Sequence, residues 1–172
     1  LVRTSLKNHI KNYTFFSYHK EEALHLSRRE TSTVTCLLEH IEEELHHPID
    51  AHTGTILSRH IELLLDYCTR FYERQFITRN EANKTIIKQF DKIINNHFET
   101  KQVPTVDILS HKYCANLLHL SPEYFNDLLK YETGKSFKEY IEFKRFEIAK
   151  DWLVNTDKTI NQITQELGFQ NP

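Results

Sequence analysis

SHKYCANLLHLSPEYFNDLLKYE, residues 110–132, contains two serines that suit helix starts, each followed by a short apolar pattern at helical spacing. Ser110 and Ser121 are typical helix N-caps, and Pro122 suits the first position of a helix because its φ is already helical. Ala115 is small enough to let two helices cross closely. Apolar side chains would fill the space between them: Leu118, Leu120, Phe125 and Leu129. The stretch therefore predicts two short helices joined by a tight turn at Leu120–Ser121, a helix-turn-helix.

A related pattern begins 49 residues later, where Ile163–Phe169 (ITQELGF) aligns with Cys114–Leu120 (CANLLHL). Gly168 and His119 take the same place in the two patterns, a turn position for which we expect a positive φ. Residues 137–154 between them predict one helix of about 27 Å, at 1.5 Å per residue. Such a helix would space two DNA-reading elements roughly one DNA turn apart, about 34 Å.

The rest of the chain also predicts an all-α fold. Only 3 Gly and 4 Pro interrupt 172 residues, and apolar residues recur at helical spacing over 21–47, 55–75 and 80–97. We expect the first of these helices to break near Arg29–Ser32, because hydroxyl side chains favour caps over helix interiors. The aromatic run Tyr13–Tyr18 is compatible with one short N-terminal strand.

Overall charge gives no sign of a strongly basic nucleic-acid binder. The net charge is −2; residues 1–99 carry 13 Lys+Arg against 14 Asp+Glu, and residues 100–172 carry 9 against 10. Any affinity for DNA must come from local groups. No apolar stretch is long enough for a transmembrane helix, and the first residues lack a secretory signal, so we expect a cytoplasmic protein with reduced thiols at Cys36, Cys68 and Cys114.

The run LSPEYFNDLLKYETGKSFKEYIEFKRFEIAKDWLVNTDKTINQITQELGFQNP, residues 120–172, resembles the DNA-binding domain of AraC/XylS-type transcription regulators. The ETGKSF turn, the linker-helix pattern R-x-x-x-A-K-x-x-L from Arg145 to Leu153, and the closing Gly168-Phe169 are all in register with that family. Upstream, FYERQFITR (residues 71–79) with the helices that follow resembles members common in Bacteroidetes.

This resemblance implies a domain plan. Residues 1–99 would be the end of an effector domain followed by a helical dimerisation and coupling segment, residues 100–105 a linker, and residues 106–172 the DNA-binding domain. The implied partners are double-stranded DNA, a second copy of the chain, and a small-molecule effector bound by an upstream domain. No membrane, cofactor, metal or catalytic activity is implied.

In a helix-turn-helix, the leading part of the second helix enters the major groove. The side chains expected to face bases are Glu123, Asn126, Asp127 and Lys130. Those expected to position phosphates are Ser121, Lys135 and Ser136. Family members often carry Arg where this chain has Asp127, and an acidic residue there repels phosphate but accepts from cytosine N4.

We expect the chain to be a fragment, cut at both ends. It begins at Leu1 without a methionine, and it stops at Pro172, where the family continues with a Y/F-F-S-R-x-F-K run in a second recognition helix. The first helix-turn-helix would then be complete and the second would lack its recognition helix.

Four other interpretations stay open. The fragment could act as a dimerisation module without DNA binding. Histidines and carboxylates at His40, Glu43, Glu44 and His47 could share a helix face and hold a metal, although a solvated acidic face explains them more simply. The basic series Lys84, Lys88 and Lys92 could contact phosphates or the DNA-binding domain, although a solvated helix face explains it more simply. The aromatic series Tyr67, Phe71, Tyr72 and Phe76 could line a cofactor pocket, although such a series more often belongs to a core or a dimer interface.

Overall fold

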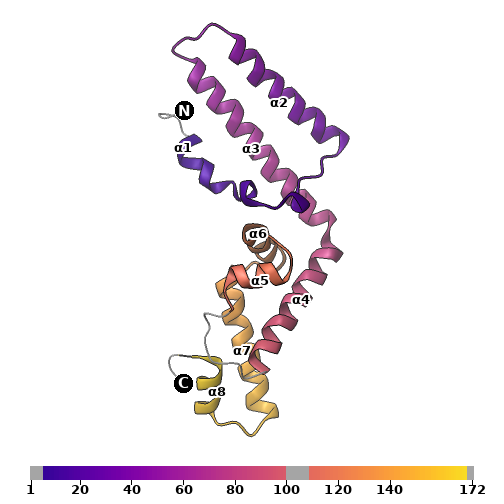
Figure 1. Ribbon diagram of the computed structural model, residues 1–172, viewed down its shortest axis with the longest axis vertical. Helices are drawn as coiled ribbons and strands as arrows, with labels where there is room; N and C mark the ends of the chain where they lie inside the picture. The colour runs from indigo at the N-terminus through magenta and orange to yellow at the C-terminus, as the bar shows by residue number, and fades with distance from the viewer. Residues whose placement is uncertain (1–5, 100–108, 170–172) are drawn as a thin grey trace. The chain divides into compact units, whose positions relative to one another are not determined.

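The computed structural model describes residues 6–99 and 109–169, which form helices and no strand (Figure 1). The all-α prediction is therefore confirmed. The chain divides into two compact units, residues 1–79 and 80–172. We expected the division at residues 99/100, but the helix that starts at Asn80 packs with the C-terminal unit through Phe90 and Ile94, which are fully buried. The expected linker, residues 100–105, lies outside the described residues.

The N-terminal unit is built on two long helices, α2 (Arg28–His46) and α3 (Thr53–Thr78), which lie side by side (Figure 1). The short helix α1 (Leu6–His9) precedes them and contacts α3. Three 3-10 turns follow α1, at Ile10–Asn12, Thr14–Ser17 and Lys20–Glu22. Residues 6–26 thus form an irregular segment before α2 begins.

The short strand allowed for Tyr13–Tyr18 is not present, because Thr14–Ser17 forms a 3-10 turn. The aromatic rings of this run pack on α3 instead. The ring of Phe15 stacks on Tyr72 with 5.4 Å between centroids, and Tyr18 meets the same ring edge-on at 5.1 Å. Aromatic residues favour strands only where a neighbouring strand pairs with their backbone groups, and here a helix supplies the packing surface.

The break predicted near Arg29–Ser32 is also wrong, because α2 begins at Arg28 and continues through these residues. Ser27 caps the helix by accepting from the Glu30 backbone, and the Glu30 carboxylate accepts from the Ser27 backbone at 2.7 Å. Further along, Thr31, Ser32 and Thr33 donate their hydroxyls to carbonyls four residues earlier, at 3.0–3.2 Å. Their hydroxyls are therefore satisfied inside the helix.

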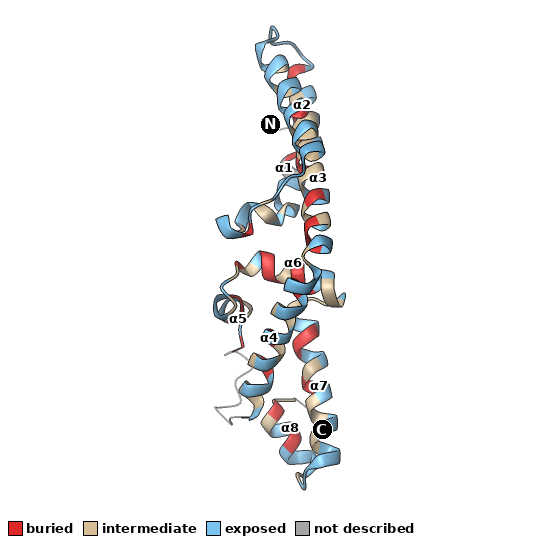
Figure 2. Cartoon of the chain, turned by 90° about the vertical axis from the view of Figure 1, so that its right-hand side faces the viewer, coloured by how far each residue is buried: buried red, intermediate tan, exposed pale blue. Residues whose placement is uncertain are grey.

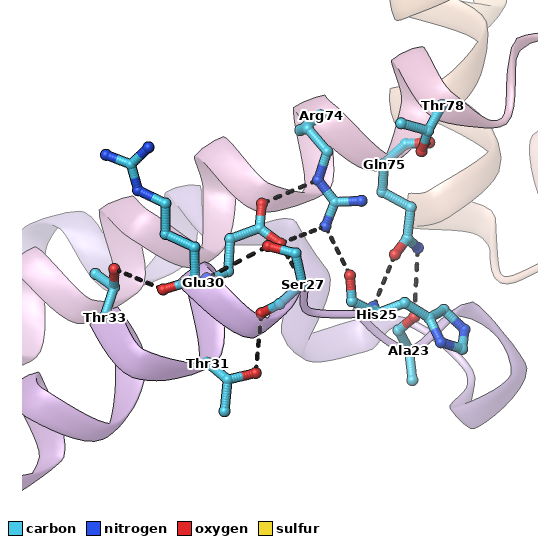
Figure 3. A network of polar contacts seen from close by, with 10 residues as sticks. Ala23, His25, Ser27, Glu30, Thr31, Thr33, Arg74, Gln75 and Thr78 are labelled. Carbon is cyan, nitrogen blue, oxygen red and sulfur yellow. Dashed lines mark hydrogen bonds and ion pairs between the residues drawn. The ribbon is translucent and has the colours of Figure 1, made fainter.

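A cluster of polar contacts, which we call the Arg74 clamp, fastens the segment before α2 to the end of α3 (Figure 3). Arg74 binds Glu30 through two nitrogens, at 3.0 and 2.9 Å, and donates to the His25 carbonyl at 2.6 Å. The side chain of Gln75, which is 2% exposed, donates to the Ala23 carbonyl and accepts from the His25 backbone. The clamp thus joins residues that are 44 to 52 positions apart.

The C-terminal unit contains five helices among the described residues: α4 (Asn80–Glu99), α5 (His111–Leu117), α6 (Pro122–Thr133), α7 (Phe137–Asn155) and α8 (Ile160–Leu167). Their buried faces appear as red bands in Figure 2. The core draws on four of these helices and on Leu109; its buried members are Phe90, Ile94, Leu109, Cys114, Ala115, Phe125, Leu129, Tyr140 and Ile141.

Within the described part of the chain, none of the helices has the length and apolar character needed to cross a membrane.

Candidate nucleic-acid interface

The turn between α5 and α6 has the geometry that its sequence predicts. His119 takes a left-handed conformation with φ of 57°, and the Leu120 backbone donates to the Ala115 carbonyl at 3.0 Å, which ends α5. Ser121 then caps α6, and Pro122 is its first residue. The positive φ expected at Gly168 is also found, at 69°. The chain bends sharply at Leu118–Ser121, so α5 and α6 are separate helices.

Apolar packing holds α6 against the rest of its unit. Cys114 and Ala115 on α5 are fully buried, as are Phe125 and Leu129 on α6. The ring of Phe90 on α4 meets Phe125 edge-on, with 4.9 Å between centroids. The inner face of α6 is therefore fixed by close contacts on both α4 and α5, and its orientation does not depend on exposed groups.

The four side chains predicted to face bases keep access to solvent. Glu123 and Lys130 are exposed, and Asn126 and Asp127 are half-buried. They occur at spacings of one, three and four residues, so they share one side of α6. The neighbouring helix α5 exposes Lys112, Tyr113 and Asn116. The leading turns of α6 thus offer a polar surface of mixed charge.

The three side chains predicted to position phosphates all make contacts within the chain. Ser121 is fully buried and accepts from the Tyr124 backbone at 3.2 Å, so it orients α6 and has no surface for phosphate. Ser136 caps α7, with its backbone and hydroxyl both donating to the Glu139 carboxylate at 2.7 Å. The ammonium of Lys135 lies over the Phe143 ring, 5.1 Å from its centroid.

Glu139 explains why the start of α7 differs from a simple anion site. A helix N-terminus attracts anions through its free backbone N–H groups. The hydrogen bonds from the Ser136 hydroxyl and backbone lower the pKa of the Glu139 carboxyl, so the carboxylate is stabilised at this position. The Ser136 backbone N–H and hydroxyl are therefore already bound by the chain's own acidic side chain.

Sequence reasoning did not single out His111, the first residue of α5. Its ring lies 5.1 Å from Phe137 and stacks on Phe125 at 5.9 Å. Burial lowers the pKa of His111, against weaker opposing effects from Glu123, the Pro122 backbone and Asp127. The imidazole packs beside the leading turns of α6, and its burial favours the neutral form. The packing of His111 against Phe137 is visible only in the structure, because these residues of α5 and α7 are far apart in sequence.

The second pattern, at Ile163–Phe169, forms the same local structure as the first. Ile163 is buried like its counterpart Cys114, and the Phe169 backbone donates to the Thr164 carbonyl at 2.9 Å, as the Leu120 backbone does to Ala115. Leu167 is buried as well, and α8 packs on α7. Thr159 caps α8 in a box with Gln162. Residues beyond Phe169 lie outside the described part of the chain.

The remaining residues that the sequence singled out lie on helix surfaces or in the core. Among the described residues, no group of three or more His, Cys, Asp or Glu side chains is arranged to hold a metal ion. His40 lies beside His60 of α3, with 5.6 Å between ring centroids. Lys84, Lys88 and Lys92 are exposed on α4. In the aromatic series, Phe71 and Phe76 are buried in the core.

The helices α5 and α6 are short and are joined by a turn that caps α6. The inner face of α6 is fixed by packing and its leading turns are accessible, which is the arrangement of a helix-turn-helix domain. Residues 114–172 match the family model described as a helix-turn-helix domain.

Similar proteins occur in Bacillus subtilis (strain 168). YtdP, an HTH-type transcriptional regulator, is 33% identical over 88 residues, which are 51% of this chain and 10% of YtdP. YobQ, another HTH-type transcriptional regulator, is 38% identical over 63 residues, or 37% of this chain and 26% of YobQ. The transcriptional regulatory protein YesN is 37% identical over 67 residues, or 37% of this chain and 18% of YesN. The chain thus spans a minor part of each relative. No solved structure matches it significantly.

Proposed function

We propose that this chain is part of a sequence-specific transcription regulator that reads the major groove of DNA with α6. The observation that carries the proposal is the two-sided character of α6. Its inner side is fixed by Phe125 and Leu129, which are fully buried, while Glu123 and Lys130 on the other side are exposed. A reading helix needs both a rigid mounting and free polar groups.

The chemistry of the exposed side chains suggests which bases they contact. Asn126 suits adenine, to which an amide makes two hydrogen bonds, and Lys130 suits the acceptors of guanine. Glu123 and Asp127 are acceptors and suit the amino group of cytosine. An acidic pair gains nothing from phosphates, so base contacts must contribute a larger share of the affinity than in a basic recognition helix.

For phosphate contact we propose Lys135 from the predicted set, with Lys112 as an added candidate. Lys135 is half-buried, and the contact between its ammonium and the Phe143 ring is worth on the order of 1 kcal/mol, so a phosphate competes for it. Lys112 is exposed in the first turn of α5. In helix-turn-helix proteins the first helix crosses the DNA backbone, which favours contact by this turn.

Replacing Asn126 with alanine is expected to weaken binding to the target about tenfold and to reduce discrimination against shuffled DNA, because a two-bond contact to one base is lost. Fluorescence anisotropy with the gene's own upstream DNA and a shuffled duplex, at two salt concentrations, measures this. Asn95→Ala, an exposed position on α4, is the matched control. Equal effects of the two substitutions would exclude base contact by Asn126. The proposed function itself would be wrong if the wild type bound the target and the shuffled duplex equally at both salt concentrations.

We also propose that the N-terminal unit supports a homodimer. Leu38 and Leu45 on α2 are 50% and 64% exposed. They are seven residues apart, so they share one side of the helix and form a row that a second copy would cover. A small-molecule effector, bound by an upstream domain, remains a proposal that rests on the family resemblance.

Sedimentation of the chain at tens of micromolar checks the dimer. We expect a species of twice the chain mass, and Leu38→Glu combined with Leu45→Glu should convert it to the monomer because two charges would enter the apolar row. Leu38 and Leu45 are not in the core, so the double variant should keep its helical content. A wild type that sediments as a monomer at this concentration counts against the dimer.

A further inference from the structure

The recognition helix carries a polar tether on the side opposite its base-facing residues. The amide of Asn83, in the first turn of α4, donates to a carboxylate oxygen of Glu132, near the end of α6, at 3.2 Å. Asn83 is 1% exposed, and Glu132 is half-buried. Both residues belong to the C-terminal unit, in which α4 packs directly on α6.

A buried amide is costly unless its hydrogen bonds are satisfied, so a side chain as enclosed as Asn83 holds its partner in a defined place. The apolar contacts of α6 act differently. Burial of the Phe125 and Leu129 side chains favours contact but has little directional preference. The Asn83–Glu132 bond therefore adds a directional contact near the C-terminal end of α6, and it acts together with the close-packed core to fix the rotation of the helix about its own axis.

Position along α6 links this tether to base contact. Glu132 follows Glu123 by nine residues, and at about 100° per residue the two side chains lie on opposite sides of the helix. Rotation that moves Glu132 away from Asn83 must therefore swing Glu123 and Asn126 by the same angle relative to the rest of the unit.

We propose that Asn83 is a positioning residue for DNA recognition: through Glu132 it sets the rotation of α6 and thereby aims the base-facing side chains. This inference rests on the proposed function. It assigns a part in recognition to α4, which lies outside the helix-turn-helix and carries none of the side chains predicted to face bases.

Reversal of the pair provides the test, because Asn83→Asp combined with Glu132→Gln keeps both side-chain lengths and exchanges donor and acceptor. Asn83→Asp alone places two carboxylates together, and we expect it to lower the ratio of target to shuffled-DNA affinity about tenfold, or 1.4 kcal/mol. Glu132→Gln alone keeps an acceptor oxygen and should change the ratio less than twofold. The reversed pair should recover the ratio to within about threefold of wild type.

Asp91→Asn serves as the control on the same helix. Asp91 accepts from the Tyr140 hydroxyl at 2.8 Å and pairs with Lys144 at 2.9 Å, so it links α4 to α7 and not to α6. This substitution should lower the unfolding temperature while the discrimination ratio stays unchanged. If Asn83→Asp does not fold, Glu132→Ala removes the tether from the α6 side and should lower the ratio about fivefold.

Two results overturn the inference. One is a reversed pair that folds but discriminates no better than Asn83→Asp; the other is Glu132→Ala with the wild-type ratio. The inference is also overturned if Asp91→Asn lowers the ratio of target to shuffled-DNA affinity as much as Asn83→Asp does. The Asn83–Glu132 bond would then be a general stabilising contact. Failure of the proposed function is distinguishable, since the wild-type chain itself would then show no preference between the two duplexes.

Discussion

Phe125→Ala is expected to destabilise the C-terminal unit by about 3–5 kcal/mol, because a large aromatic side chain leaves a cavity that its neighbours cannot fill. Phe125 is fully buried, and its ring meets Phe90 at 4.9 Å, His111 at 5.9 Å and Phe137 at 6.2 Å. The substitution removes the aromatic contacts that α6 makes with α4, α5 and α7. Urea unfolding followed by circular dichroism measures the loss.

Phe143→Ala on α7 is the matched control for this change. Its ring is 42% exposed and outside the buried core, so its removal should cost less than about 1.5 kcal/mol. If both alanine variants lose the same free energy of unfolding, Phe125 is not the packing centre of the helix-turn-helix. DNA binding by Phe125→Ala should fall in parallel with the folded fraction.

Arg74→Met is expected to destabilise the N-terminal unit by about 2 kcal/mol. The change leaves the Glu30 carboxylate, which is 13% exposed, without its cation, and it removes the donor to the His25 carbonyl. Thermal unfolding of the chain measures the loss. Arg70→Met is the control. Arg70 is exposed one turn earlier on α3, and its guanidinium lies over the Tyr67 ring, 5.4 Å from the ring centroid.

The same clamp gives a pH dependence with a definite sign. The Ser27 backbone hydrogen bond lowers the pKa of the Glu30 carboxyl, and Arg74 lowers it further, against the opposing effect of burial. When the pKa of a carboxyl is lower in the folded than in the unfolded protein, the carboxylate stabilises the fold at pH values above its ordinary pKa of 4.5. This contribution to the free energy of unfolding is lost as the pH falls below 4.5 and through the lowered pKa. Wild type should therefore lose more stability than Arg74→Met between pH 6 and pH 3, and parallel curves would argue against the clamp.

The parts of the fold that sequence predicted well depend on local chemistry. Ser121 and Pro122 start α6, and His119 and Gly168 take positive φ, because the preferences that govern caps and turns act within a few residues. The helix-turn-helix was predictable for the same reason. Its buried positions follow from helical spacing alone.

The parts that sequence did not predict depend on contacts between distant residues. The Arg74 clamp joins positions that no periodicity relates, and Tyr13–Tyr18 forms turns because α3 offers Tyr72 as a packing partner. At the interface, the burial of Ser121 and the occupation of the α7 start by Glu139 both required the packed structure. Residue type alone made Ser121 and Ser136 look available to phosphate.

Cys114, buried in the core where α5 meets α6, gives this chain an internal reporter of its own motion. Burial raises the pKa of its thiol to about 11, and thiol reagents attack the thiolate. Cys36 is exposed and reports how fast a reagent reaches an open site. The rate at which Cys114 is alkylated, compared with the rate at Cys36, then measures how often α5 and α6 separate. DNA that binds the packed form of α5 and α6 should slow the alkylation of Cys114, and the experiment needs no introduced label.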